Sequence, residues 1–295
     1  MNSMIDTYLK NYADAGLYVM QGRLGPIEDG RFQCFPSTRW REEIEFASRV
    51  GLRGIEWIYD AYGEGANPLE TPAGREELRS LLDKHQVSVV SVCADYFMDM
   101  PFLRCTDQQR DERLARLQWL IGVCAELNIT RIVLPFVDAS RIQDAAERLQ
   151  VVATLKGALG QAEVHQVELH LETDLSPDDF KALLQSIGHP MVKVNYDAGN
   201  SASLGYAPEA EFQAYGQWVG SVHIKDRRLR GTTVPLGDGN TDFSALRQVL
   251  VDYSYRGDFV LQVARSKPGD ELNWMRHVAN TASDWLRGDL VINHR

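Results

Sequence analysis

The sequence has few cysteines, and they do not form a cluster. The four cysteines stand at positions 34, 93, 105 and 124, so no CxxC pair occurs. This spacing argues against a zinc knuckle and against the disulfide framework of a small secreted domain. Each cysteine is therefore expected to be a free, buried thiol, which suits the reducing cytoplasm.

Long apolar runs and a basic N-terminal segment are also missing. No stretch approaches the ~18 uninterrupted apolar residues of a membrane-spanning helix. The first residues, MNSMIDTYLKNYADAG, lack the basic start and apolar run of a signal peptide. With 31 Lys and Arg residues against 41 Asp and Glu residues, the net charge is −10, whereas a nucleic-acid partner calls for a concentrated basic face. We expect a cytoplasmic protein with no membrane or nucleic-acid partner.

Short apolar runs alternate with longer amphipathic stretches along the 295 residues. The runs predict strands at 17–21, 54–58, 87–92, 131–134, 167–172, 192–197, 221–225 and 259–263. The stretches between them predict helices; in 40–50, for example, apolar residues fall on one helical face. Eight strands, each followed by a helix, are the pattern of a closed parallel barrel. The sequence predicts an α/β protein in which residues 1–295 form a single (β/α)₈ TIM-barrel domain.

The alternative to a barrel is an open, doubly wound sheet. Such a sheet normally carries a GxGxxG turn for a dinucleotide after its first strand. Here the first predicted strand runs into Gln21-Gly22-Arg23-Leu24-Gly25, which lacks that pattern. The closed barrel is therefore the preferred prediction.

Polar side chains stand at the carboxyl ends of the last four predicted strands. They are Glu172, Asp197, His223 and Gln262. Active sites of TIM barrels form at this end of the strands, so the four side chains are expected to converge. Each alone can be a satisfied buried polar group, but four at one rim favour a functional site. Carboxylate, imidazole and amide oxygen together suit a divalent metal ion such as Mn²⁺, Mg²⁺, Co²⁺ or Zn²⁺.

Three of these residues lie in segments that resemble the xylose isomerase-like barrel superfamily. The segments are 171–173, 196–200 and 222–226, followed by the Gly-rich loop 235–239 before Asp242 and Phe243. The superfamily includes sugar phosphate isomerases and epimerases, ketose 3-epimerases, inosose dehydratase and endonuclease IV. The resemblance implies one divalent metal held by Glu, Asp, His and Glu from strands five to eight. Matching motif by motif puts Glu172, Asp197 and His223 at the first three positions and Gln262 at the fourth.

The glutamine at the fourth position decides which mechanisms remain open. By the resemblance, one Glu of an epimerase removes a proton next to a carbonyl and the opposite Glu returns it to the other face. An amide cannot take that proton. One interpretation is a one-base isomerase, in which Glu172 shuttles the proton through an enediolate. A second is an epimerase in which Asp95, Glu56 or Lys225 supplies the other proton.

Further residues that follow the strands are predicted to complete the site. Lys225 is expected either to pair with Asp226 or to polarise a substrate oxygen. The predicted substrate-binding residues are Arg23, Glu56, Trp57, Asp95, Arg227 and Arg265. Guanidinium groups suit phosphate or carboxylate, but the three arginines can instead pair with nearby acids such as Asp226. Likewise, the Gly-rich loop 235–239 can bind a phosphate through its N–H groups or serve as a turn or lid.

The residues and the resemblance together predict a sugar or sugar-phosphate isomerase or epimerase that uses one divalent metal ion. Mn²⁺ is the preferred prediction for that ion. Glu172 and Lys225 are the predicted catalytic residues, and the expected partner is a small sugar substrate. By the resemblance, the protein is expected to form a homodimer or homotetramer. An inosose- or dehydroshikimate-type dehydratase on the same metal site and a metal-weak sugar-binding protein are the alternatives.

Overall fold

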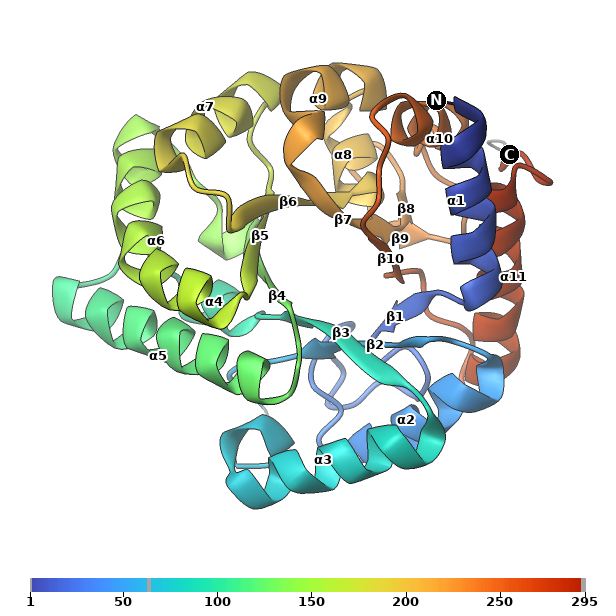
Figure 1. Cartoon of the computed structure of the whole chain (residues 1–295), viewed down its shortest axis with the longest axis horizontal. Coiled ribbons are helices and arrows are strands. Elements are labelled where there is room, and N and C mark those ends of the chain that lie inside the picture. The colour runs from blue at the N-terminus through green and yellow to red at the C-terminus, as the bar shows by residue number, and fades with distance from the viewer. Residues whose placement is uncertain (1, 63–64, 293–295) are drawn as a thin grey trace.

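Eight parallel strands form a closed barrel in the computed structural model, which describes residues 2–62 and 65–292 (Figure 1). The strands are β1 (Tyr18–Met20), β2 (Gly54–Ile58), β3 (Ser88–Cys93), β4 (Arg131–Phe136), β5 (Glu168–Thr173), β6 (Val192–Asp197), β7 (Val219–Ile224) and β10 (Asp258–Leu261). They pair in the order β1-β10-β7-β6-β5-β4-β3-β2, and β1 also pairs with β2, which closes the ring. The predicted (β/α)₈ TIM barrel is confirmed.

Burial on both faces explains why these short runs form strands. Every residue of β2 is buried, and only the first residue of β3 is exposed. In a parallel barrel one face of each strand packs in the interior and the other packs under helices, so continuous apolar runs are favoured over alternation.

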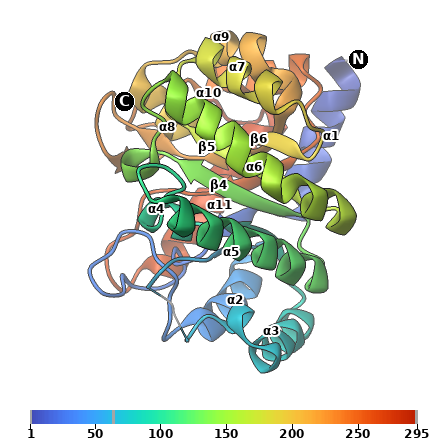
Figure 2. The same ribbon diagram turned by 90° about the vertical axis from the view of Figure 1, so that its left-hand side faces the viewer.

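Long helices cover the outside of the barrel, and short ones follow the carboxyl ends of the strands. They are α1 (Asn2–Ala15), α2 (Trp40–Val50), α3 (Pro72–His85), α4 (Tyr96–Asp99), α5 (Asp107–Glu126), α6 (Ala145–His165), α7 (Pro177–Ile187), α8 (Ala198–Leu204), α9 (Pro208–Tyr215), α10 (Phe243–Asp252) and α11 (Glu271–Arg287). The side view shows α5 and α6 packed along one flank (Figure 2). Capping residues mark where several of these helices begin. At the start of α7, the Ser176 side chain accepts a hydrogen bond from the Asp179 N–H, and Pro177 is the first helical residue.

Helix α1 precedes the first strand and was not predicted from the sequence. It lies beside α11 (Figure 1). Ile5, Leu9 and Tyr12 are buried and lie on one face of α1, at the spacing of an amphipathic helix. The Tyr12 hydroxyl donates to Asp258 Oδ1 at 2.8 Å, so α1 also contacts the first residue of β10. In the described part of the chain, no helix is long and apolar enough to cross a membrane.

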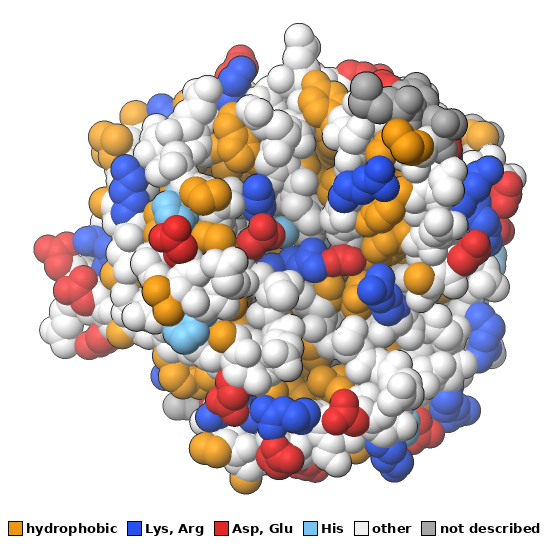
Figure 3. Space-filling view, viewed as in Figure 1, with side chains coloured by type: hydrophobic (Ala, Val, Ile, Leu, Met, Phe, Trp, Pro, Cys, Tyr) orange, Lys and Arg blue, Asp and Glu red, His pale blue; other side chains and the backbone are white. Residues whose placement is uncertain are grey.

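Paired polar side chains close the end of the barrel at which the strands begin. Arg131 on β4 pairs with Asp258 on β10, and Glu168 Oε2 lies 2.8 Å from His170 Nε2 on β5. Figure 3 shows side chains of both charges scattered over the molecule in the orientation of Figure 1. Because these polar groups are paired with one another, the chemistry is expected at the opposite end, where the strands finish.

Candidate active site

Glu172, Asp197 and His223 converge at the carboxyl ends of β5, β6 and β7. The register of β6 and β7 places Asp197 directly beside His223. His223 Nδ1 lies 3.5 Å from Glu172 Oε2 and 3.7 Å from Asp197 Oδ2. One possible ligand atom from each residue lies within 4.8 Å of the other two. The structure therefore brings together three of the four predicted metal ligands.

Glu56 sets the orientation of the His223 imidazole. His223 Nε2 lies 2.7 Å from Glu56 Oε1, and the Ser91 hydroxyl donates to Glu56 Oε2 at 2.5 Å. The Nε2 side of the ring thus lies against Glu56 and Nδ1 lies on the side of Glu172 and Asp197, as in the carboxylate–histidine–metal arrangement. Glu56 has no exposed surface, so the predicted contact with substrate does not fit its position.

The charges of this cluster shift one another's pKa values. Burial lowers the pKa of His223, but the nearby carboxylates, Glu56 foremost, outweigh it and raise that pKa well above its ordinary value. Burial favours a raised pKa for Asp197, but Lys225 and His223 hold it below its ordinary range. Burial and the Asp197 charge raise the pKa of Glu172 to about 7. Two carboxylates and an imidazole nitrogen directed at one point are a donor set that fits a divalent cation.

Two asparagines that were not predicted from the sequence hold the Glu172 carboxylate. Asn195 Nδ2 donates to Glu172 Oε2 at 2.8 Å, and Asn200 Nδ2 donates to Oε1 at 2.6 Å. The Ser221 hydroxyl donates to Asn195 Oδ1 at 2.6 Å, which sets the orientation of that amide. A signal for both was present: Asn200 ends the Asp-x-Gly-Asn turn, and Asn195 stands two residues before Asp197, on the same side of β6.

The Lys225 ammonium lies between the ends of β6 and β10. Its Nζ donates to Asp197 Oδ2 at 3.1 Å, to Gln262 Oε1 at 3.0 Å and to Asn200 Oδ1 at 3.2 Å. An ammonium has three N–H donors and no acceptor, so these three oxygens match its full capacity. The predicted fourth metal ligand, Gln262, thus turns its oxygen toward Lys225.

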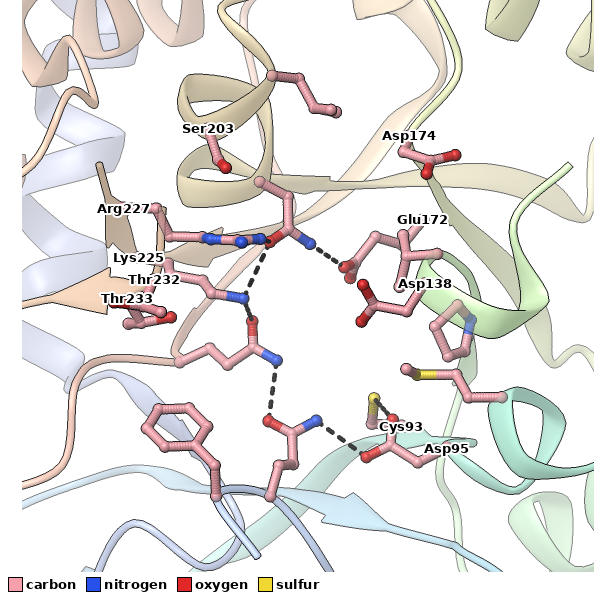
Figure 4. A pocket seen from close by; sticks show the side chains of 18 residues that line it. Cys93, Asp95, Asp138, Glu172, Asp174, Ser203, Lys225, Arg227, Thr232 and Thr233 are labelled. Carbon is pink, nitrogen blue, oxygen red and sulfur yellow. Dashed lines mark hydrogen bonds between the residues drawn. The ribbon is translucent and has the colours of Figure 1, made fainter. Parts of the chain in front are cut away.

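A line of hydrogen bonds continues from Gln262 to the end of β3. Gln262 Nε2 donates to Gln33 Oε1 at 3.1 Å, and Gln33 Nε2 donates to Asp95 Oδ2 at 2.9 Å. The Cys93 thiol donates to Asp95 Oδ1 at 3.2 Å. Figure 4 shows these contacts along one side of the pocket. Gln33 lies in the irregular segment after β1, where the sequence offered no signal for it.

These side chains line a cavity of about 570 Å³ at the mouth of the barrel (Figure 4). Of the predicted site residues, those in its wall are Asp95, Glu172, Lys225, Arg227 and Gln262. A volume in this range is typical of pockets for small molecules. The cavity therefore suits the small polar substrate expected from the sequence.

Two of the three predicted substrate-binding arginines anchor a loop instead. Arg23 is buried and donates to Val263 O at 3.1 Å, Phe32 O at 3.1 Å and Gln33 Oε1 at 2.9 Å. Arg265 donates to Phe32 O at 2.7 Å. The carbonyl groups of this irregular segment need donors because no strand or helix supplies them. Neither arginine lies in the cavity wall, so the predicted substrate contacts do not fit, and neither does the alternative of pairing with acids on the rim.

Trp57 likewise lies away from the cavity. It has no exposed surface, and its Nε1–H donates to Asn67 Oδ1 at 3.1 Å. Its ring packs edge-on against Trp40 with centroids 5.8 Å apart. The alternation of side chains along β2 directs Trp57 outward, under the helices, so it is part of the core and the predicted sugar contact does not fit.

Arg227 does lie in the cavity wall, but the Gly-rich loop does not present its N–H groups there. Arg227 Nη1 donates to Asn200 Oδ1 at 2.7 Å, beside the short antiparallel pair β8 (Asp226–Arg227) and β9 (Thr233–Val234). Gly237 N and Gly239 N donate to Asp226 Oδ2 at 2.8 and 2.9 Å. The loop is thus held by a buried carboxylate, and phosphate binding through these N–H groups does not fit.

A family model and a curated relative each match most of this chain. Residues 44–287 match the model of the family described as xylose isomerase-like TIM barrel. A relative from Escherichia coli strain K12, called putative L-ribulose-5-phosphate 3-epimerase SgbU, is 25% identical over 242 residues, covering 77% of this chain and 85% of its own.

Solved structures share the fold. A xylose isomerase-like TIM-barrel protein from Mycobacterium smegmatis, in complex with magnesium, superposes with a TM-score of 0.70 at 17% identity, over 95% of this chain and 99% of that one. D-Psicose 3-epimerase with D-tagatose, from Clostridium cellulolyticum H10, gives 0.64 at 14% identity, over 93% and 95%. The matched residues include all three converging side chains, and the chain belongs to the xylose isomerase-like TIM-barrel family.

Proposed function

We propose that this protein is a metal-dependent isomerase or epimerase of a sugar or sugar phosphate, with Glu172 as the base. The protein is an enzyme of the isomerase and epimerase type, and the metal, the mechanism and the substrate are the proposed parts. The observation that carries the proposal is the position of Glu172. Its carboxylate lines the cavity, is 6% exposed, and belongs to the cluster that fits a divalent ion.

Glu172 is prepared to take a proton from a carbon next to a carbonyl. Hydrogen bonds from Asn195 and Asn200 fix both of its oxygens and oppose the effect of burial by favouring the charged form. In the metal-free protein its pKa of about 7 lets the carboxylate accept and release a proton near neutrality. A divalent ion held by Glu172, Asp197 and His223 would supply polarisation of the substrate carbonyl when bound.

The donor set accepts several divalent ions, and we propose Mn²⁺ first, with Mg²⁺, Co²⁺ and Zn²⁺ as alternatives. Gln262 stays a predicted fourth ligand through its oxygen. Lys225 supports the site by placing a positive charge 3.1 Å from Asp197. The name L-ribulose-5-phosphate 3-epimerase, borne by relatives over most of this chain, favours removal of the proton beside a ketose carbonyl.

Proton exchange tests the proposal directly. Purified protein loaded with Mn²⁺ is incubated in D₂O with ketopentoses and their 5-phosphates, and NMR locates the deuterium. We expect incorporation at the carbon next to the carbonyl, slowed about 10²–10⁴-fold by Glu172→Gln. Glu209→Gln, an exposed glutamate on α9, is the matched control and should exchange normally. Wild-type exchange rates in Glu172→Gln, or no exchange in metal-loaded wild type, would rule the proposal out.

A further inference from the structure

We propose that Asp95 is the second acid–base residue of an epimerisation, acting on the face of the substrate opposite to Glu172. This assignment rests on the proposed function, because it presumes that Glu172 removes a proton next to a carbonyl. Asp95 lies just beyond β3, is 9% exposed, and lines the same cavity as Glu172. Glu172 lies at the end of β5 and Asp95 follows β3, with β4 between them in the closed order, so the two carboxylates reach the cavity from different directions (Figure 4).

The need for a second residue follows from Gln262. Its amide stands at the strand end that faces Glu172 across the barrel mouth, three strands away in the closed order. Its oxygen accepts from Lys225 and its nitrogen donates to Gln33, and an amide neither gives nor takes a proton near neutrality. A proton for the second face must therefore come from another group in the cavity wall.

A continuous chain of hydrogen bonds joins Glu172 to Asp95. Lys225 stands at its centre and can only donate. On one side it donates to Asn200, which donates to Glu172 Oε1. On the other side it donates to Gln262, and the bonds continue through Gln33 to Asp95 Oδ2. Every amide is thereby oriented with its N–H away from the ammonium, so both arms end as donors to a carboxylate.

The other residues predicted for this role are buried or already make contacts with other groups. Glu56 has no exposed surface and holds His223. Lys225 donates to three oxygens, which occupies all of its N–H bonds. Two other carboxylates of the cavity wall, Asp138 and Asp174, lie on the Glu172 side (Figure 4).

The surroundings of Asp95 keep both of its protonation states within reach. Burial raises its pKa to about 6, although the hydrogen bonds from Gln33 and Cys93 act in the opposite direction. A carboxyl group with such a pKa can donate a proton in one direction of an epimerisation and accept one in the other.

The step balances as follows. Glu172 takes the proton, and the C–H electron pair forms the C=C bond of an enediolate while the carbonyl pair moves to oxygen. Protonated Asp95 then gives its proton to the opposite face of the same carbon, and the C=O bond forms again. Glu172 ends protonated and Asp95 ends as a carboxylate. Exchange of protons with water restores both groups, so no oxidant, reductant or co-reactant is needed.

The test separates proton removal from inversion. In D₂O, the ketose epimer whose proton faces Glu172 is given to wild type and to Asp95→Asn, both loaded with Mn²⁺. We expect Asp95→Asn to exchange that proton within about threefold of the wild-type rate while it inverts the carbon at least about 10²-fold more slowly. Asp95→Glu should recover part of the inversion. Asp111→Asn, an exposed aspartate on α5, is the matched control and should keep both rates.

Several results would overturn the assignment. If Asp95→Asn inverts the carbon at the wild-type rate, the assignment is wrong. It is also wrong if Asp95→Asn has a wild-type circular dichroism spectrum but loses exchange and inversion equally. If the wild-type protein itself exchanges the proton but does not invert the carbon, the second acid–base role is wrong and Glu172 remains the base. A metal-loaded wild type that exchanges no proton overturns the proposed function itself, and the assignment with it.

Discussion

Lys225 Nζ donates to Gln262 Oε1 at 3.0 Å, and this contact orients the Gln262 amide because an ammonium can only donate. The same Nζ lies 3.1 Å from Asp197 Oδ2. A positive charge therefore stands between a predicted metal ligand of β6 and the position after β10 where the resemblance implies a glutamate. The amide at that position leaves the metal cluster with one negative charge fewer.

Gln262→Glu should raise the affinity for Mn²⁺ by about tenfold or more. A carboxylate in place of the amide adds a negative charge beside the cation, and partly buried charges at such distances interact by a few kcal/mol. Gln262→Ala is the matched variant, and its affinity should fall by less than about threefold, because the amide carries no charge. Isothermal titration of metal-free protein measures both. Equal or weaker binding by Gln262→Glu would contradict the expectation.

Metal binding should strengthen as pH rises from 6 to 8. The pKa of Glu172 is raised to about 7, and that of His223 lies well above its ordinary value. Both groups must lose their protons to become ligands, so protons compete with the metal. We expect the dissociation constant to fall at least about tenfold over this interval, with proton release detected by titration in buffers of different ionisation enthalpy. A pH-independent affinity would show that these groups are not ligands.

Glu43→Gln should stabilise the metal-free protein more at pH 8 than at pH 5.5. Burial raises the pKa of Glu43 from 4.5 to about 7, although its carboxylate accepts the Gly22 and Leu24 N–H groups. The folded state therefore binds its proton more tightly than the unfolded state does, and stability is lost as pH rises from about 4.5 through 7. Glutamine does not titrate, so the difference in free energy of unfolding should grow by about 1–3 kcal/mol. Urea unfolding with a chelator at both pH values measures it; a constant difference would contradict the shift.

Gly54→Ala should destabilise the barrel by about 3 kcal/mol. A Cβ at Gly54 would stand 1.9 Å from the Ser88 carbonyl oxygen, so β2 and β3 would have to separate. Gly122→Ala is the control, because a Cβ on that side of α5 meets none of the described atoms within 4 Å. It should stabilise the protein by about 0.5–1 kcal/mol through helix propensity. Urea midpoints compare the two, and equal stabilities would contradict the close strand approach.

Asp226→Asn should loosen the loop that follows β9. The buried Asp226 carboxylate accepts N–H groups from Gly237, Gly239 and Thr241 at 2.8 to 3.0 Å. An amide offers one acceptor oxygen where the carboxylate offers two, and it carries no charge. We expect a loss of about 2–3 kcal/mol in the free energy of unfolding and faster hydrogen exchange at these three amides. Unchanged protection at them would show that the carboxylate does not hold the loop.

The sequence by itself determined the barrel and the convergence of Glu172, Asp197 and His223 at its rim. Eight apolar runs of strand length, separated by amphipathic stretches, leave few arrangements other than a closed parallel barrel. Because all strands of such a barrel end at one rim, residues as distant in sequence as Glu172 and His223 had to converge there. Helix α1 was not predicted, because it precedes the first strand and lies outside the repeating strand–helix pattern. Its buried residues Ile5, Leu9 and Tyr12 nevertheless follow a helical period.

Only the tertiary structure decided which rim residues reach the cavity. Arg23 and Asp95 both follow strands in the sequence, yet the arginine turns to the carbonyl groups of its own loop while the aspartate faces the pocket. Strand order does not set the direction of a side chain in an irregular segment; the available hydrogen-bond partners do. For the same reason Gln33 was not predicted, although it lies on the hydrogen-bond chain between Lys225 and Asp95.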